Sequence, residues 1–152
     1  MEKILKVQEV SNAYQVLRNA KYQKLEDADK IKLWKVSRQL KPIALKAEED
    51  FKDAATSLKP DGFDKNLEKA RAYEKAKAEE LTELPMSEEE YKAFLVEFKE
   101  FDNLVKKALK EFQEKEVTVK FDALSEEAFG SLMASNEWTL AQLENIEWLV
   151  ED

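Results

Sequence analysis

Basic residues and a tryptophan recur within the stretch KIKLWKVSRQLK. On a helix, Lys32, Lys35 and Arg38 are expected to fall near one side, with Trp34 within reach of that side and Lys41 continuing the series. Lysine and arginine bind phosphate groups, and a helix that adds an aromatic ring can hold a nucleic acid backbone. The stretch is therefore a candidate nucleic-acid surface.

The alternative interpretation of this stretch is structural. Trp34 would then belong to the core with Ile31 and Leu33, and the lysines would form the solvated face of the helix. The net charge of −8 for the whole chain opposes nonspecific binding to polyanions and to anionic membrane surfaces. We therefore favour the structural interpretation and keep nucleic-acid binding as the alternative.

Two further tryptophans, Trp138 and Trp148, lie ten residues apart in the acidic C-terminal part of the chain. Tryptophan is enriched at the energetic centres of protein interfaces, although packing in the core is its commoner role. An exposed indole at either position would mark the docking point of a protein partner.

The composition gives no positive sign of an enzyme. There is no histidine and no cysteine, which excludes Ser-His-Asp and Cys-His nucleophiles and histidine metal sites. Two glycines are too few for a phosphate-binding loop or a dinucleotide fingerprint. Runs such as SEEEY are expected to be helix starts or solvated faces, which need no metal. We expect no catalytic, metal or cofactor site, and a carboxylate enzyme with a divalent metal remains only as a third alternative.

Length and composition predict one mainly helical domain over residues 1–152. The chain is 38% charged and poor in the turn formers glycine and proline. No window approaches the roughly 20 apolar residues of a membrane helix, and the N-terminal residues lack the apolar run of a signal peptide. A cytoplasmic protein is expected. Net charge is +4 over residues 1–59, −5 over 60–116 and −7 over 117–152. This asymmetry can reflect attraction between parts of the fold or a basic surface that meets a partner, and we favour the first explanation.

The expected fold is an antiparallel bundle of long helices with a small β patch. The alternation in EVTVKF (116–121) predicts a strand that pairs with KILKV (3–7), in parallel or antiparallel orientation. Such a ribbon needs helices over its apolar side. An apolar stripe from Leu33 to Leu58 predicts a long helix that bends at Pro42, the alternative being two helices joined there. KPDGFDKN (59–66) then ends it.

The helix expected at the centre of the core begins at LPMSEEEY, where Ser87 and Glu90 form a capping box. Its apolar residues from Tyr91 to Phe112 are expected to pack on the stripe from Leu33 to Leu58. A thinner, alanine-rich helix precedes it. A C-terminal cap of short helices follows the strand, and the last of these is capped by Thr139. The buried face of that helix is expected to be Leu140, Leu143, Ile146 and Leu149 or Val150.

Four segments together resemble small helical proteins of bacteriophages and prophages whose function is mostly unassigned. They are VSNAYQVLRNAKYQKL, KLWKVSRQLKPIALKAEEDF, VTVKFDALSEEAF and LAQLENIEWLVED, so the resemblance spans nearly the whole chain. The helix KARAYEKAKAEEL departs from it, being longer and more regular than expected there. The resemblance implies a non-enzymatic part in particle assembly or host–phage interaction, in a bacterial cytoplasm or with a phage particle. A protein partner or self-association is expected, and no small-molecule substrate is inferred.

Overall fold

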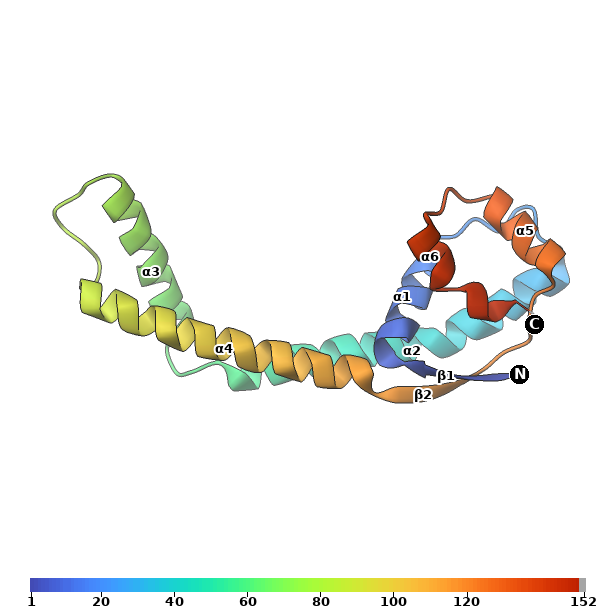
Figure 1. Cartoon of the computed structure of the whole chain (residues 1–152), viewed down its shortest axis with the longest axis horizontal. Helices are drawn as coiled ribbons and strands as arrows, with labels where there is room; N and C mark the ends of the chain where they lie inside the picture. Colours follow the sequence, from blue (N-terminus) through green and yellow to red (C-terminus); the bar gives the residue numbers. More distant parts are fainter. Residues whose placement is uncertain (151–152) are drawn as a thin grey trace. The chain divides into compact units, whose positions relative to one another are not determined.

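The computed structural model describes residues 1–150, which are mainly helical with a small sheet (Figure 1). Residues 1–50 and 111–150 form one compact unit and Phe51–Lys110 a second. The single domain expected from the sequence stays a prediction. Each unit is described by itself. No helix in this part of the chain is long and apolar enough to cross a lipid bilayer. The elements are β1 (Glu2–Lys6), α1 (Val7–Arg18), α2 (Asp27–Leu58), α3 (Phe63–Ala78), α4 (Glu88–Glu114), β2 (Glu116–Lys120), α5 (Glu126–Ala134), α6 (Leu140–Glu144) and a 3-10 turn (Glu147–Leu149).

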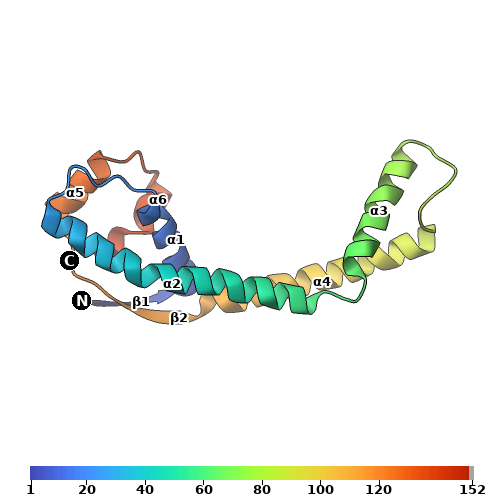
Figure 2. The same cartoon turned by 180° about the vertical axis from the view of Figure 1, so that it is seen from behind.

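The predicted strand pair is present in the first unit and is antiparallel. Its register runs from Glu2 opposite Lys120 to Lys6 opposite Glu116, and both figures of the whole chain show β1 and β2 side by side (Figures 1 and 2). The outer edge of β2 is closed by Gln39 of α2. The Gln39 Nε2 donates to the Lys120 carbonyl at 2.7 Å, and the Lys120 N–H donates to the Gln39 Oε1 at 2.8 Å.

Helices cover the apolar side of this ribbon and form the core of the first unit. Val10, Tyr14 and Leu17 share the buried face of α1. The core joins this face to the first half of α2, to the strands and to the C-terminal segment. Its fully buried large side chains are Leu17, Leu33, Leu40, Leu124, Leu132, Ile146, Leu149, Val10, Val36 and Val119.

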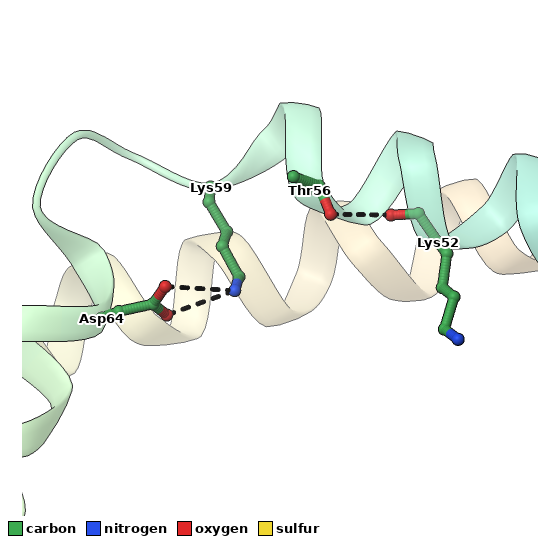
Figure 3. Close-up of polar contacts among 4 residues, drawn as sticks. All are labelled: Lys52, Thr56, Lys59 and Asp64. Atoms are coloured by element: carbon green, nitrogen blue, oxygen red, sulfur yellow. Dashed lines mark hydrogen bonds and ion pairs between the residues drawn. The ribbon is translucent and has the colours of Figure 1, made fainter.

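Helix α2 runs unbroken from Asp27 to Leu58 with Pro42 inside it, so the alternative of two helices joined there is wrong. The helix ends immediately before the predicted stop at 59–66, but the turn is shorter than predicted, because α3 already begins at Phe63 in the second unit. Gly62 has φ 71°, a left-handed conformation that suits glycine. Figure 3 shows that Lys59 reaches across the turn to the Asp64 carboxylate at 3.2 Å, while the Thr56 hydroxyl donates to the Lys52 carbonyl at 3.0 Å.

The second unit has its own apolar cluster between α3 and α4, which a loop connects (Figure 2). The Phe63 ring lies 5.7 Å from that of Phe94 and 4.6 Å from that of Phe101, and Tyr73 stacks on Tyr91 at 4.4 Å between ring centroids.

The prediction that α4 is the helix at the centre of the core is wrong, while the packing of its apolar face on Leu33–Leu58 stays a prediction. Phe94 is the one buried residue among those of α4, and Leu95 and Phe98 are 44% and 40% exposed. The buried part of the α2 stripe, Leu33 to Ala44, belongs to the core of the first unit. Periodicity shows which residues share a face, but it does not show how much surface lies opposite that face.

The predicted helix starts are present. The Ser87 hydroxyl accepts from the Glu90 N–H at 3.1 Å, but within residues 1–150 the Glu90 side chain does not accept from Ser87 in return, so the predicted capping box is only half formed. Thr139 forms a complete capping box with Gln142. The predicted buried face of the last helix is only partly correct, because Leu140 is 72% exposed. Helix α6 ends at Glu144, and a 3-10 turn follows at Glu147–Leu149. Ile146 and Leu149 are buried in the core, but they lie after α6 and do not belong to its helical face.

Candidate functional site

The structure separates the four basic residues of the candidate nucleic-acid surface. They are spaced three apart, and a step of three residues falls about 60° short of a full turn of an α-helix. Over three such steps the side chains rotate by about 180°, which places Lys32 and Lys41 on opposite sides of α2. Only Arg38 and Lys41 line the same hollow as Trp34.

That hollow, which we call the Trp34 groove, is a cavity of about 520 Å³ between α1, the segment that follows it and α2. The Trp34 side chain is 58% exposed, so the expectation that it belongs to the core is wrong, although its neighbour Leu33 is buried. The groove is lined by Tyr14, Leu17, Arg18, Tyr22, Lys30, Trp34, Ser37, Arg38 and Lys41.

Cations surround the exposed indole of this groove. The Arg38 guanidinium carbon lies 5.3 Å from the centroid of the Trp34 ring, within cation–π range. Lys30 lies 3.8 Å from the Asp27 carboxylate, an exposed pair that neutralises little of its charge. Within residues 1–150, Arg18, Arg38 and Lys41 make no ion pair, and no acidic side chain lines the groove.

The floor of the groove is apolar and uncharged. Tyr14 and Leu17 are buried there, and the Tyr22 hydroxyl donates to the Leu17 carbonyl. Burial raises the pKa of Tyr22, while its hydrogen bond with Ser37 acts in the opposite direction and is the smaller effect. The phenol therefore stays neutral at physiological pH, and the positive charge lies at the rim of the groove.

Lys32 and Lys35 lie in other surroundings. The Lys32 ammonium donates to the Ala123 carbonyl at 3.2 Å and pairs with Asp29 at 3.5 Å, so it ties α2 to the segment after β2. Lys35 lines a separate hollow with Gln39 and Lys120. Neither lysine contributes to the Trp34 groove.

The two C-terminal tryptophans are half-buried and pack against the core of the first unit. The Trp148 ring meets Phe121 edge-on at 5.1 Å, and its Nε1 donates to the Asn145 carbonyl at 2.9 Å, which is a structural role. Trp138 lines a hollow of about 260 Å³ between α1 and α6. We call this hollow the amide groove, and it is lined by Asn12, Gln15, Val16, Asn19, Trp138, Gln142 and Asn145.

The parts of the Trp34 groove that lie outside the basic stretch have no signal in the sequence. Arg18 and Tyr22 come from α1 and the segment after it, so no local pattern joins them to α2. A signal was present within α2 itself, because Lys30, Trp34 and Lys41 are four and seven residues apart and so share one helix face.

No group of three or more acidic residues in the described part of the chain is arranged to hold a metal ion. Comparison with known proteins found no family model, no curated protein and no solved structure that matches this chain.

Proposed function

We propose that this chain is a non-enzymatic interaction protein that binds an acidic segment of a protein partner in the Trp34 groove. One observation carries the proposal. An indole that is 58% exposed lies among cations, with no acidic residue of the described chain lining the groove, on a protein whose net charge is −8. A local positive site on an acidic protein selects for negative partners and speeds their encounter.

The groove combines the two features that bind a protein segment tightly. Its indole and apolar floor can bury an aliphatic or aromatic side chain of the partner, and such anchors supply most of the binding energy at interfaces. Its rim offers Arg38 and Lys41 to carboxylates on either side of that anchor. Arg38 already lies over the Trp34 ring, which limits the side-chain freedom that binding would remove.

Nucleic-acid binding is the second candidate function. The exposed Trp34 ring favours it, because a base could stack there beside Arg38. A nucleic acid backbone, however, needs a row of cations along its path. Since Lys32 is paired with Asp29 and Lys35 lies at another hollow, the cations gather at one place, and a short acidic segment fits them better.

The process that we propose is the assembly of a phage particle, or an interaction between phage and host, in a bacterial cytoplasm. It rests on the resemblance of the helix and strand order to small phage and prophage proteins. The geometry of the Trp34 groove is compatible with any process that presents an acidic, partly apolar peptide.

Fluorescence polarisation can test the proposal with two labelled probes of equal charge. One is a peptide of Asp and Glu residues around a central Leu and Phe, and the other is an oligo-dT strand. We expect the peptide to bind more tightly and Arg38→Glu to weaken it about tenfold or more, a loss of about 1.4 kcal/mol. Lys35→Glu, which makes the same charge change on another side of α2, should weaken it less than about twofold.

Equal losses for Arg38→Glu and Lys35→Glu would contradict the assignment to the groove, because a general charge effect would then suffice. Tighter binding of oligo-dT than of the peptide, lost in Arg38→Glu, would establish the second candidate in its place. Trp34→Ala tests the apolar anchor apart from the charge, since it should weaken peptide binding while every cation of the groove remains.

A further inference from the structure

The amide groove differs in chemistry from the rest of the surface. Five of its seven lining residues are asparagine or glutamine, although the chain of 152 residues contains only 12 of these, against 58 charged residues. No charged side chain of the described chain lines this hollow. A random patch of so charged a protein would contain several charges, so the groove has an unusual and specific composition.

Two of the amides that line the groove are held in place. The Asn19 Nδ2 donates to the Gln15 carbonyl at 3.0 Å, and the Gln142 Oε1 accepts from the Thr139 N–H at 2.9 Å in the capping box of α6. The Asn145 backbone is fixed as well, because its carbonyl accepts from the Trp148 indole. Residues that are already oriented cost less to order when a ligand binds.

Other amides of the groove have hydrogen-bonding capacity to spare. The side chains of Asn12, Gln15 and Asn145 have no hydrogen-bond partner within residues 1–150. Each amide side chain offers an acceptor oxygen and two N–H donors close together. A ligand that itself carries adjacent donors and acceptors would satisfy them best, and neighbouring hydroxyl groups do this.

The apolar part of the groove is Trp138, which is half-buried and packs against the core, together with Val16. An indole presents a flat apolar surface. One face of a sugar ring is covered by C–H groups while its edge carries hydroxyls, so a sugar ring can match both the indole and the amides. A volume of about 260 Å³ is smaller than the roughly 300–1,000 Å³ of sites for drug-sized ligands. The groove therefore suits a single ring of a longer ligand.

We propose that the amide groove binds a neutral carbohydrate, with one sugar ring against Trp138 and its hydroxyls on the amides of α1 and α6. A charged sugar would bring a phosphate or carboxylate to a place without a compensating cation. The amide groove is a different site from the Trp34 groove, on which the proposed function rests. Asn12 and Gln15 of α1 and its C-cap Asn19 line the amide groove, while Tyr14 and Arg18 of the same helix line the Trp34 groove.

The test uses ¹H–¹⁵N NMR of the intact protein, in which the side-chain NH₂ groups of Asn and Gln give their own signals. The probes are cellobiose, maltotriose and diacetylchitobiose at about 10 mM, a concentration that fills a site of millimolar affinity. We expect at least one of them to shift the NH₂ signals of Asn12, Gln15 and Asn145 and the indole N–H signal of Trp138. Glucose 6-phosphate and glucuronate should shift them much less.

The variants Asn12→Ala and Gln15→Ala test the site without disturbing the core, since both side chains are exposed. Each should weaken saccharide binding about fivefold or more, which corresponds to about 1 kcal/mol, the contribution of one hydrogen bond. Gln8 is an exposed residue of α1 that does not line the groove, so Gln8→Ala should leave binding unchanged. The proposal is overturned if none of the neutral probes shifts these signals, if the charged sugars shift them equally, or if Gln8→Ala weakens binding as much as Asn12→Ala.

Discussion

Arg38 holds its guanidinium carbon 5.3 Å from the centroid of the Trp34 ring, one turn away on the same helix. A cation and an aromatic ring in this relationship attract each other by about 0.5–1 kcal/mol at an exposed site. The contact keeps a large apolar ring at the surface of a groove instead of letting it fold back along α2. It also places a positive charge beside the one strongly exposed indole among the three tryptophans of the chain.

This arrangement predicts how the fluorescence of Trp34 is quenched. Iodide is attracted to cations, whereas acrylamide is neutral. The preference for quenching Trp34 over the other two indoles should therefore be larger with iodide than with acrylamide. Trp34→Phe should remove most of the iodide-sensitive emission, because Trp138 and Trp148 are half-buried. Arg38→Gln should lower iodide quenching but leave acrylamide quenching nearly unchanged. Equal iodide quenching in the wild type and in Trp34→Phe would contradict the exposure assigned to Trp34.

The core of the first unit predicts a large difference between two leucines of α2. Leu40 is fully buried, whereas Leu45 is 46% exposed on the same helix. Leu40→Ala should lower the free energy of unfolding by about 2–5 kcal/mol, since it leaves a cavity. Leu45→Ala should change it by no more than about 0.5 kcal/mol. Urea denaturation followed by circular dichroism measures both, and similar losses for the two variants would refute the burial pattern.

The second unit offers an equally close pair in α4. Phe94 is buried against Phe63, while the next residue, Leu95, is exposed. Phe94→Ala should cost about 3 kcal/mol of local stability and speed hydrogen exchange of the α3 amides. Leu95→Ala serves as the matched control and should leave that exchange nearly unchanged. If α3 amides exchange at the same rate in both variants, the cluster does not stabilise α3.

Alkaline pH should destabilise the first unit through Tyr22. Burial raises the pKa of Tyr22 in the folded state, so the folded chain holds this proton more tightly than the unfolded chain. The resulting stability is complete below the unfolded pKa of about 10 and is lost as the pH rises through the folded pKa. Tyr22→Phe loses the hydrogen bond to the Leu17 carbonyl at every pH but cannot ionise.

The stability difference between the wild type and Tyr22→Phe should therefore shrink as the pH rises above the unfolded tyrosine pKa of about 10. Thermal melts across that range measure it. The pKa of Tyr91 is also raised, chiefly by its hydrogen bond with Glu74, but Tyr91 is present in both proteins and cancels in the comparison. A difference that does not change as the pH rises above about 10 would contradict the burial of the Tyr22 phenol.

The parts of the fold that the sequence predicted well are those fixed by local rules. Alternation in EVTVKF identified β2, and the polar residues Ser87 and Thr139 at helix starts both accept hydrogen bonds from their own first turns. These features depend on residues three or four apart, which a single sequence displays directly.

The sequence could not show what lies opposite a given face. The apolar stripe of α4 and that of α2 have similar periodicity, yet the buried residues of α2 lie in one cluster and Phe94 of α4 lies in another. The same limit applies to the two grooves. Arg18 lines the Trp34 groove and Asn12 lines the amide groove because α1 packs between other elements. Such long-range packing produces no regular spacing of residues in the sequence.

The double hydrogen bond between Gln39 and Lys120 also bears on how the chain behaves at high concentration. A side-chain amide that takes both the N–H and the C=O of a strand residue occupies the place of a further strand, so a foreign strand cannot continue the sheet there. At the other edge the Glu9 carboxylate takes the Lys6 N–H at 2.7 Å, and Lys3 adds a charge. A two-stranded ribbon is the type of element from which amyloid-like stacking can grow, and here side chains block part of both edges against it.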